Sequence, residues 1–272
     1  MTYIQSIILG IIQGASEFLP ISSSGHLVLA PYLFGWEIST REAFVFDVLV
    51  QVATLSAVII YYWKDLVLIL KAFVQGIIQK KPFDDNNSRL GWFLILATIP
   101  AGAAAVIFKD TFEEAFSNPK SAAVFLLVTS ALLLIGELLG KRIRQLDSLT
   151  WADALLIGIC QVFALFPGVS RSGSTITGGL LRKFDRGASA RFSFLMAVPV
   201  MSAAGLIAVI DLVQSPELFT NIPVYLAGFI TSAIVGYFSI RWFIGYLSRQ
   251  SLYIFAAYCA VLGLGFLAYF SL

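Results

Sequence analysis

Residues 10–26 of this chain read GIIQGASEFLPISSSGH, and residues 158–175 read GICQVFALFPGVSRSGST. The second stretch repeats the first 148 positions later, from Gly10 to Gly158, and both keep a Gly-Ile-x-Gln start and a Ser-x-Ser-Gly end. Each copy also carries a proline shortly before its serines. Segments interrupted by glycine and proline at corresponding places in two halves of a membrane chain are the best sequence pointer to a functional site. The pair therefore predicts two related halves and a site where the two broken segments meet.

The composition assigns the chain to the membrane class. Of its 272 residues, 58% are hydrophobic and 12% are charged, and the mean hydropathy is +0.87. A soluble domain carries roughly 25% charged residues. Several runs approach the ~20 apolar residues that cross a bilayer. We therefore expect an all-α polytopic membrane protein.

Six continuous spans and two broken segments account for the apolar residues. The broken segments, about 3–34 and 151–181, are apolar at both ends and interrupted by proline, glycine and serine. Irregular backbone at membrane depth is tolerated only inside protein or beside a water-filled cavity, so we interpret both as re-entrant hairpins of two short helices. The predicted spans are about 44–63, 90–108, 121–139, 192–210, 223–243 and 251–271.

The distribution of basic residues supports this arrangement. Fourteen of the 18 lysines and arginines fall in four connections, and three fall in the opposite ones, namely Arg41, Lys109 and Lys120. Such a bias marks the rich side as cytoplasmic. The bias appears only if each hairpin returns to the side of the membrane from which it entered. The four rich connections are 64–89, 140–150, 182–191 and 241–250.

The chain is then one membrane domain, residues 1–272, with halves of about 1–148 and 149–272. Each half is a re-entrant helical hairpin plus three transmembrane helices. Because three is odd, the second half is upside down relative to the first, which is an inverted-topology repeat. The first hairpin enters from outside and the second from the cytoplasm. Glu137 and Asp153, near the ends of apolar segments, are expected at the membrane interface.

The tips of the hairpins carry unusual polar groups. Glu17 and His26, the only histidine, belong to the first tip, and Arg171 belongs to the second. Ionisable groups inside membrane segments are costly and are functional candidates by default. The arginine fork matches a phosphate, and a helix that starts at each tip points positive partial charge at the same place. Together these groups predict an anion site.

On these motifs, residues 13–26 and 167–175, the chain resembles the undecaprenyl-pyrophosphate phosphatase family of bacteria, the bacitracin-resistance type. Length, spacing and hydropathy match along essentially the whole chain. The resemblance implies a bacterial inner-membrane enzyme, open to the outer face, that removes the terminal phosphate of a C55 isoprenyl pyrophosphate. That reaction recycles the lipid carrier of peptidoglycan synthesis. The family is also associated with a divalent cation, Mg²⁺ or Ca²⁺.

The resemblance also implies roles for individual residues. Many members carry glutamate where this chain has Gln13, so a clamp of two carboxylates is not expected, and Glu17 with the substrate phosphates would hold any metal. The predicted catalytic residues are Glu17, Ser23, His26 and Arg171, and the predicted substrate-binding residues are Gln13, Ser22, Ser24, Ser170, Ser172, Ser174 and Thr175.

Two assignments of the nucleophile stay open. In one, Ser23 attacks and His26 takes its proton, since residues three apart at a helix start can share a face. In the other, His26 attacks and forms a phosphohistidine while Glu17 manages protons. We favour Ser23.

The rival function is a transporter or lipid flippase, because inverted repeats with broken helices are also the usual plan of secondary transporters. The expected partners are the polyprenyl pyrophosphate substrate and membrane lipids. A homodimer stays a hypothesis. The sequence has no basic stripe with exposed aromatics, so nothing in it indicates nucleic-acid binding.

The topology makes a direct prediction. Single cysteines placed in residues 35–43 should react with a membrane-impermeant thiol reagent added outside intact cells, and cysteines in 182–190 should react only after the membrane is permeabilised. The parent protein with its own two cysteines is the control. The reverse labelling pattern contradicts the proposed orientation.

Overall fold

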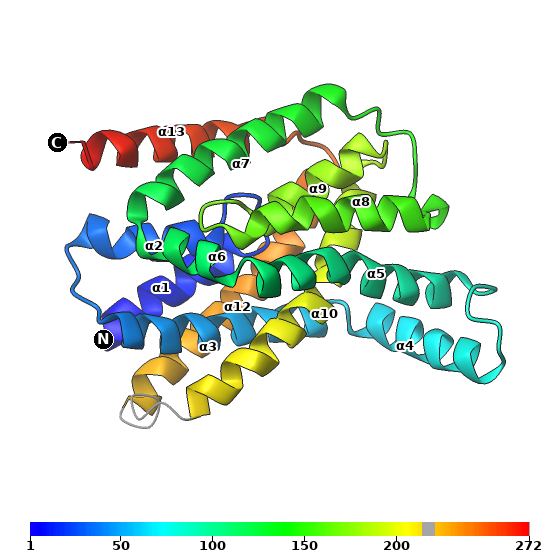
Figure 1. Cartoon of the computed structure of the whole chain (residues 1–272), viewed down its shortest axis with the longest axis horizontal. Coiled ribbons are helices and arrows are strands. Elements are labelled where there is room, and N and C mark those ends of the chain that lie inside the picture. Colours follow the sequence, from blue (N-terminus) through cyan, green and yellow to red (C-terminus); the bar gives the residue numbers. More distant parts are fainter. Residues whose placement is uncertain (214–220, 272) are drawn as a thin grey trace.

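The computed structural model describes residues 1–213 and 221–271, which form helices with no β-strand among them (Figure 1). In chain order the elements are α1 (Tyr3–Ser16), α2 (Ser23–Phe34), α3 (Thr40–Tyr61), α4 (Trp63–Ile78), α5 (Asn86–Ile107), α6 (Lys109–Ser117), α7 (Pro119–Leu139), η1 (Leu146–Ser148), α8 (Trp151–Val162), η2 (Phe163–Leu165), α9 (Arg171–Leu181), α10 (Arg186–Val213), α12 (Ile222–Leu247) and α13 (Tyr253–Tyr269).

Five helices, α3, α5, α7, α10 and α12, are long and apolar enough to cross a membrane. They coincide with five of the six predicted spans. The sixth predicted span is α13, which has 17 residues and is a shorter apolar helix. Seventeen residues is about the lower limit for a transmembrane helix. The prediction of an all-helical, multi-pass membrane protein is therefore confirmed.

Two further helices lie in segments that the charge pattern treated as connections. Helix α4 occupies much of 64–89 and packs against α5, and α6 occupies most of 109–120. On α4 the exposed apolar side chains Leu70 and Ile77 share the helix with Lys64 and Lys71. A mixture of this kind suits a helix at a membrane interface. Counting basic residues shows on which side of the membrane such a segment lies, but it does not show that the segment is helical.

Both segments expected to be broken are broken, near the places where proline and serine interrupt them. The first loop, residues 17–22, separates α1 from α2, and the second loop, residues 166–170, follows η2 and precedes α9. In Figure 1, α2 runs back toward the end of the molecule where α1 begins, and α9 runs back toward the end where α8 begins. The two loops therefore enter the middle of the molecule from opposite ends.

The repeated serine and glycine have the same local role in both copies. Ser22 is the N-cap of α2, and its side chain accepts a hydrogen bond from the Gly25 N–H at 3.3 Å. Ser170 is the N-cap of α9 and accepts from the Gly173 N–H at 3.0 Å. A serine that bonds the third residue of a helix satisfies one of its four unpaired N–H groups. The pattern Ser-x-x-Gly thus specifies two helix starts at the two loops.

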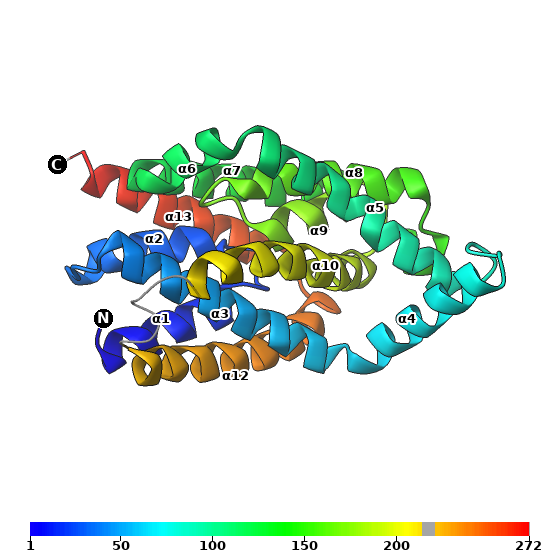
Figure 2. The ribbon, with the colours of Figure 1, turned by 60° about the horizontal axis from the view of Figure 1, so that its bottom comes forward.

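Each hairpin packs against a helix of the other half. Helix α1 packs along α12, and α8 packs along α5; Figures 1 and 2 both show α1 beside α12. The approach is close enough to require small residues. A Cβ on Gly10 would lie 2.6 Å from the Gly228 carbonyl oxygen, and a Cβ on Gly158 would lie 2.4 Å from the Ala97 carbonyl oxygen. Membrane helices associate largely through such close packing.

Glu137 and Asp153 lie near helix ends and are buried inside the protein, with 5% and 0% of their surface exposed. Each carboxylate is covered by arginines from the connections predicted to be cytoplasmic, which compensate the cost of burying a charge; their depth at the membrane interface stays a prediction. Glu137 is paired with Arg142 and Arg186, and Asp153 is paired with Arg144 and Arg182.

The close contact of α1 and α12 can be tested with a matched pair of variants. Gly10→Ala should lower the stability of the folded protein by about 1–3 kcal/mol, because a methyl group overpacks the crossing. Gly102→Ala, at an exposed helical position with nothing within 4 Å, should be neutral or stabilising by up to ~1 kcal/mol through helix propensity. Thermal unfolding in detergent measures both. Equal stability of the two variants contradicts the packing argument.

Candidate active site

The two loops are joined by an ion pair and a hydrogen bond. The Arg171 Nη2 atom lies 3.0 Å from Glu17 Oε1, and the two side chains are only 13% and 9% exposed. The Ser172 hydroxyl donates to the Leu19 carbonyl oxygen at 3.0 Å. A Cβ on Gly25 would lie 2.9 Å from the Gly168 Cα atom, so the two backbones also touch. The predicted convergence of acidic and guanidinium groups from the two hairpins is present in this structure.

Glu17 connects the charged groups with the first serine motif. Its Oε2 atom accepts a hydrogen bond from the Ser23 hydroxyl at 2.5 Å and one from Gln13 Nε2 at 3.1 Å. Gln13 is 1% exposed and also lies 3.4 Å from the Thr54 hydroxyl. The carboxylate is thus held by Arg171 on one oxygen and by an amide and a serine on the other. In this arrangement it can accept the proton of Ser23.

Arg171 is held from its own hairpin as well. Its Nη1 atom donates to the Ser193 carbonyl oxygen at 3.3 Å. The Thr175 hydroxyl donates to the Arg171 carbonyl oxygen at 2.8 Å and lies 2.7 Å from the Ser193 hydroxyl. The Nε atom of Arg171 is buried and has no hydrogen-bond partner in the part of the chain that the structure describes. An unpaired buried donor is costly, and a phosphate oxygen is a group that can satisfy it.

The second loop is fixed by Thr129 of α7. The Thr129 hydroxyl donates to the Gly168 carbonyl oxygen at 2.7 Å and accepts from the Ser170 N–H at 2.9 Å. Gly168 has φ of +96°, and a Cβ there would lie 2.2 Å from the Ala122 carbonyl oxygen. Only glycine fits this position. The loop is therefore anchored to α7 immediately before Arg171.

The other predicted hydroxyl groups form pairs near the helix starts. Ser22 and Ser24 place their Oγ atoms 3.3 Å apart, and Ser170 and Ser172 place theirs 3.1 Å apart. Ser174 is 2% exposed, and its hydroxyl has no partner among the described residues. Ser22 and Ser170 are also the helix caps, so each has a structural use besides any contact with a ligand.

His26 has two partners, and neither is a predicted site side chain. Its Nδ1 atom lies 2.6 Å from the Ser22 carbonyl oxygen, and its Nε2 atom lies 2.7 Å from the Tyr258 hydroxyl. Ser23 bonds to Glu17 instead. Within residues 1–213 and 221–271, no hydrogen bond joins His26 directly to Ser23, Glu17 or Arg171.

The electrostatics of the junction favour an anion. Helices α2 and α9 begin at Ser23 and Arg171, so both N-termini lie at the contact between the loops. A helix N-terminus carries a partial positive charge and free N–H groups that bind phosphate. The guanidinium adds a full charge. The arrangement is therefore suited to hold an anionic group that approaches Ser23.

Four residues of this site were not predicted from the sequence. Thr54, Thr129 and Tyr258 lie in apolar helices, where nothing in the pattern distinguishes them from ordinary packing residues. Ser193 had a signal, because it lies inside the Phe-x-Phe at 192–194 that echoes Phe-x-Phe at 44–46 with the same offset.

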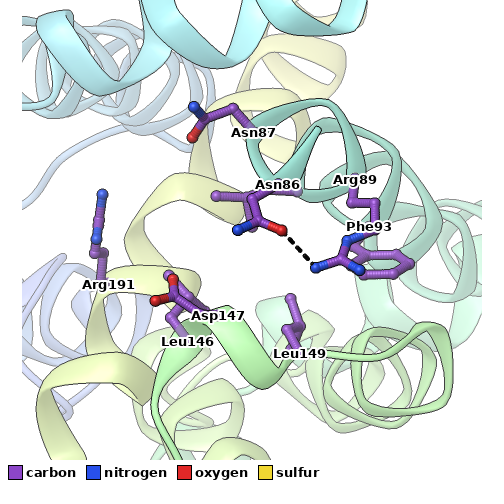
Figure 3. Close-up of a pocket in the computed structure, with 9 residues that line it drawn as sticks. Asn86, Asn87, Arg89, Phe93, Leu146, Asp147, Leu149 and Arg191 are labelled. Carbon is purple, nitrogen blue, oxygen red and sulfur yellow. Dashed lines mark hydrogen bonds between the residues drawn. The ribbon is translucent and has the colours of Figure 1, made fainter. Parts of the chain in front are cut away.

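A cavity of about 60 Å³ lies elsewhere, between the start of α5, the η1 turn and the start of α10. Figure 3 shows Arg89 and Arg191 on opposite sides of it, with Arg89 bonded to Asn86. No predicted site residue lines this cavity, so it is separate from the junction of the loops.

Fold and site together define a class: a multi-pass helical membrane protein with an anion site between two broken helical hairpins. The family model described as "Bacitracin resistance protein BacA" matches residues 6–265, and the chain belongs to that family. It is 39% identical over 267 residues to a protein named undecaprenyl-diphosphatase from Thermomicrobium roseum, covering 96% of this chain and 95% of the relative. Proteins of the same name from Methanosphaera stadtmanae and Pelodictyon phaeoclathratiforme are 41% and 40% identical; they cover 96% and 97% of this chain, and the chain covers 95% of each.

The anchoring role of Thr129 yields a prediction. Thr129→Val removes the group that bonds both Gly168 and Ser170, so the protein should lose about 1–3 kcal/mol of stability through unpaired buried groups. Thr98→Val is the matched control, since the Thr98 hydroxyl bonds only its own helix at Leu94. Thermal unfolding in detergent compares the two. A Thr129 variant as stable as the Thr98 variant contradicts the anchor.

Proposed function

We propose that this protein hydrolyses undecaprenyl pyrophosphate to undecaprenyl phosphate and inorganic phosphate. The observation that carries the proposal is the line of contacts from Arg171 through Glu17 to Ser23, placed between two helix N-termini. These groups match the needs of phosphoryl transfer, in which positioning and neutralisation of charge dominate. The full-length similarity to proteins named undecaprenyl-diphosphatase identifies the substrate.

In the proposed reaction, Ser23 is the nucleophile. Its Oγ atom attacks the terminal phosphorus, its proton passes to Glu17 Oε2, and the bond from that phosphorus to the bridging oxygen breaks. The leaving group is undecaprenyl phosphate. Water then attacks the phosphoserine and gives a proton to His26, while the Ser23 oxygen leaves and takes back the proton held by Glu17. Inorganic phosphate is released, the Ser23 hydroxyl is restored, and His26 passes its proton to solvent. The 2.5 Å contact between Ser23 and Glu17 supports Glu17, in place of His26, as the acceptor of the serine proton.

Arg171 neutralises the phosphoryl group during transfer. Its Nη2 atom bonds Glu17, and its side chain keeps 13% of its surface exposed, through which the guanidinium would meet a phosphate. His26 presents the lone pair of Nε2 and is assigned as the base for the attacking water. The two serine pairs and Thr175 surround the phosphates or hold the groups that do so.

The alternative nucleophile is His26 itself. The two routes differ in the covalent intermediate, since phosphoserine survives acid and phosphohistidine does not. Trapping the phosphorylated enzyme in acid therefore separates them.

The surroundings of the loops suit a lipid substrate. An apolar groove of about 310 Å³ is lined by Leu19 of the first loop and five residues of α12. It offers the prenyl chain an apolar surface next to Glu17, while the diphosphate stays at the junction. The residues of α12 in the groove are Ile234, Val235, Phe238, Ser239 and Trp242.

The inverted repeat belongs to the same proposal. The reciprocal packing of α1 on α12 and of α8 on α5 is the pattern expected when two halves are related by inversion. With the basic connections in the cytoplasm, the first hairpin enters the cytoplasmic membrane from outside. The resemblance to the phosphatase family supports a site that opens on that outer side. One chain supplies every predicted site residue, so the proposed reaction does not require a homodimer.

A divalent cation, Mg²⁺ or Ca²⁺, is proposed as a cofactor. Among the described residues no group of three or more histidine, cysteine, aspartate or glutamate side chains lies together. Glu17 is the carboxylate at the junction, and Mg²⁺ commonly uses one or two carboxylates plus substrate phosphates. Glu17 and the diphosphate would therefore hold the ion, which when bound would shield the charge of the phosphates.

The test is phosphate release from undecaprenyl pyrophosphate by purified protein in detergent, where transport across a membrane has no meaning. The wild type should release phosphate, and Arg171→Gln and His26→Ala should each lose at least ~10²-fold in turnover because they lose an electrostatic stabiliser or a base. Arg89→Gln, at a partly exposed arginine that lines the separate cavity and not the loops, should match the wild type.

Absence of phosphate release by the wild type would favour the transporter alternative. Wild-type turnover in His26→Ala would contradict the assigned chemistry, whatever the activity of the other variants.

A further inference from the structure

Tyr258 lies against the only histidine of the chain. It belongs to α13, in the other half of the chain from His26, yet its hydroxyl is 2.7 Å from His26 Nε2. The two rings are parallel, with an interplanar angle of 2° and centroids 5.6 Å apart. Tyr258 is 43% exposed, and the partner of its hydroxyl is the imidazole of the site.

The two contacts of His26 determine which nitrogen carries the hydrogen. Nδ1 lies 2.6 Å from the Ser22 carbonyl oxygen, which only accepts hydrogen bonds, so Nδ1 must donate. In the neutral imidazole Nε2 is then the acceptor, and the Tyr258 hydroxyl donates to it. The ring is held from both sides, and its lone pair is on Nε2.

The position of Tyr258 is set by the anchoring of α13. The adjacent Cys259 is fully buried, and its Sγ atom lies 3.8 Å from the Pro20 carbonyl oxygen of the first loop. One turn earlier, the Ala256 carbonyl oxygen accepts from the Ser130 hydroxyl of α7 at 2.8 Å. These contacts hold α13 against the first loop and α7, so the hydroxyl reaches His26 from a fixed helix.

We propose that Tyr258 is a positioning residue for His26. It keeps the imidazole in the orientation that presents a lone pair on Nε2, and its hydroxyl holds the place that water or a phosphoryl oxygen takes during the reaction. The tautomer and the ring orientation are set before the substrate arrives, and only the Tyr258 hydroxyl must give way to the attacking water. This inference rests on the proposed phosphatase function, in which His26 is the base.

One histidine in 272 residues makes a direct spectroscopic test feasible. In protein labelled with ¹⁵N-histidine, each imidazole nitrogen gives a single signal whose shift reports its protonation and hydrogen bonding. The wild type in its neutral form should show hydrogen on Nδ1 and a hydrogen-bonded lone pair on Nε2. Tyr258→Phe should move the Nε2 signal toward that of an unbonded nitrogen. A wild-type spectrum with hydrogen on Nε2 overturns the proposal, and that measurement needs no variant.

Kinetics supply the second readout. Tyr258→Phe should lower kcat roughly tenfold or more, because small displacements of a catalytic group are expensive, while KM for undecaprenyl pyrophosphate should stay within about threefold, as expected for an interaction used after binding. Tyr269→Phe, an exposed tyrosine on the same helix, should leave the spectrum and kcat at wild-type values.

The outcomes distinguish this inference from the proposed function. If His26→Ala is inactive while Tyr258→Phe has wild-type kcat, the positioning role is overturned and the phosphatase proposal stands. If the Nε2 signal moves in Tyr258→Phe but His26→Ala keeps full activity, the hydrogen bond exists but the histidine has no role as base, and the proposed chemistry fails. Loss of kcat together with the moved signal supports the inference.

Discussion

The ion pair between Glu17 and Arg171 joins two loops that neither half of the chain can bury alone. Each loop interrupts a helix within an apolar segment, where unpaired backbone groups are costly. The charged side chains of Glu17 and Arg171 are mostly buried, with 9% and 13% of their surface exposed. Because each charge is the main partner of the other, the structure can place both near the centre of a membrane protein. The same pairing brings Ser23 and Arg171 to one carboxylate, so the contact that stabilises the junction also assembles the site.

Helix capping explains why the repeated motif contains both serine and glycine. Ser22 and Ser170 cap α2 and α9 through the N–H groups of Gly25 and Gly173. Two helix N-termini are thereby aimed at one point from opposite ends of the molecule. The residue directly after the cap differs between the two copies. It is Ser23 in the first and Arg171 in the second, and in both it is the first residue of the helix. One local structure thus supplies a hydroxyl from one hairpin and a positive charge from the other.

Much of this arrangement could be predicted from the sequence, because hydrophobic length, charge bias and repetition act along the chain. The five long helices and both breaks followed from those signals. The partners of individual side chains did not. Spacing on one helix paired Ser23 with His26, but in the structure the Ser23 hydroxyl bonds Glu17, at the start of the first loop, instead. Nothing in the sequence distinguishes Tyr258 from other residues of its apolar helix, because its contact depends on how α13 packs, which no local pattern encodes.

The exchange of helices between halves also bears on how the protein is made. Helix α1 is completed at Ser16, but its main packing surface, α12, begins at Ile222. At roughly 5–20 residues per second, a ribosome needs on the order of 10–40 seconds to bridge that distance. Throughout this interval α1 lacks its main packing partner, although Arg171, the partner of Glu17, is made before α12 begins. The contact between α1 and α12 therefore forms only late in synthesis, so the first helix of the chain reaches its final packing after most of the protein has been made.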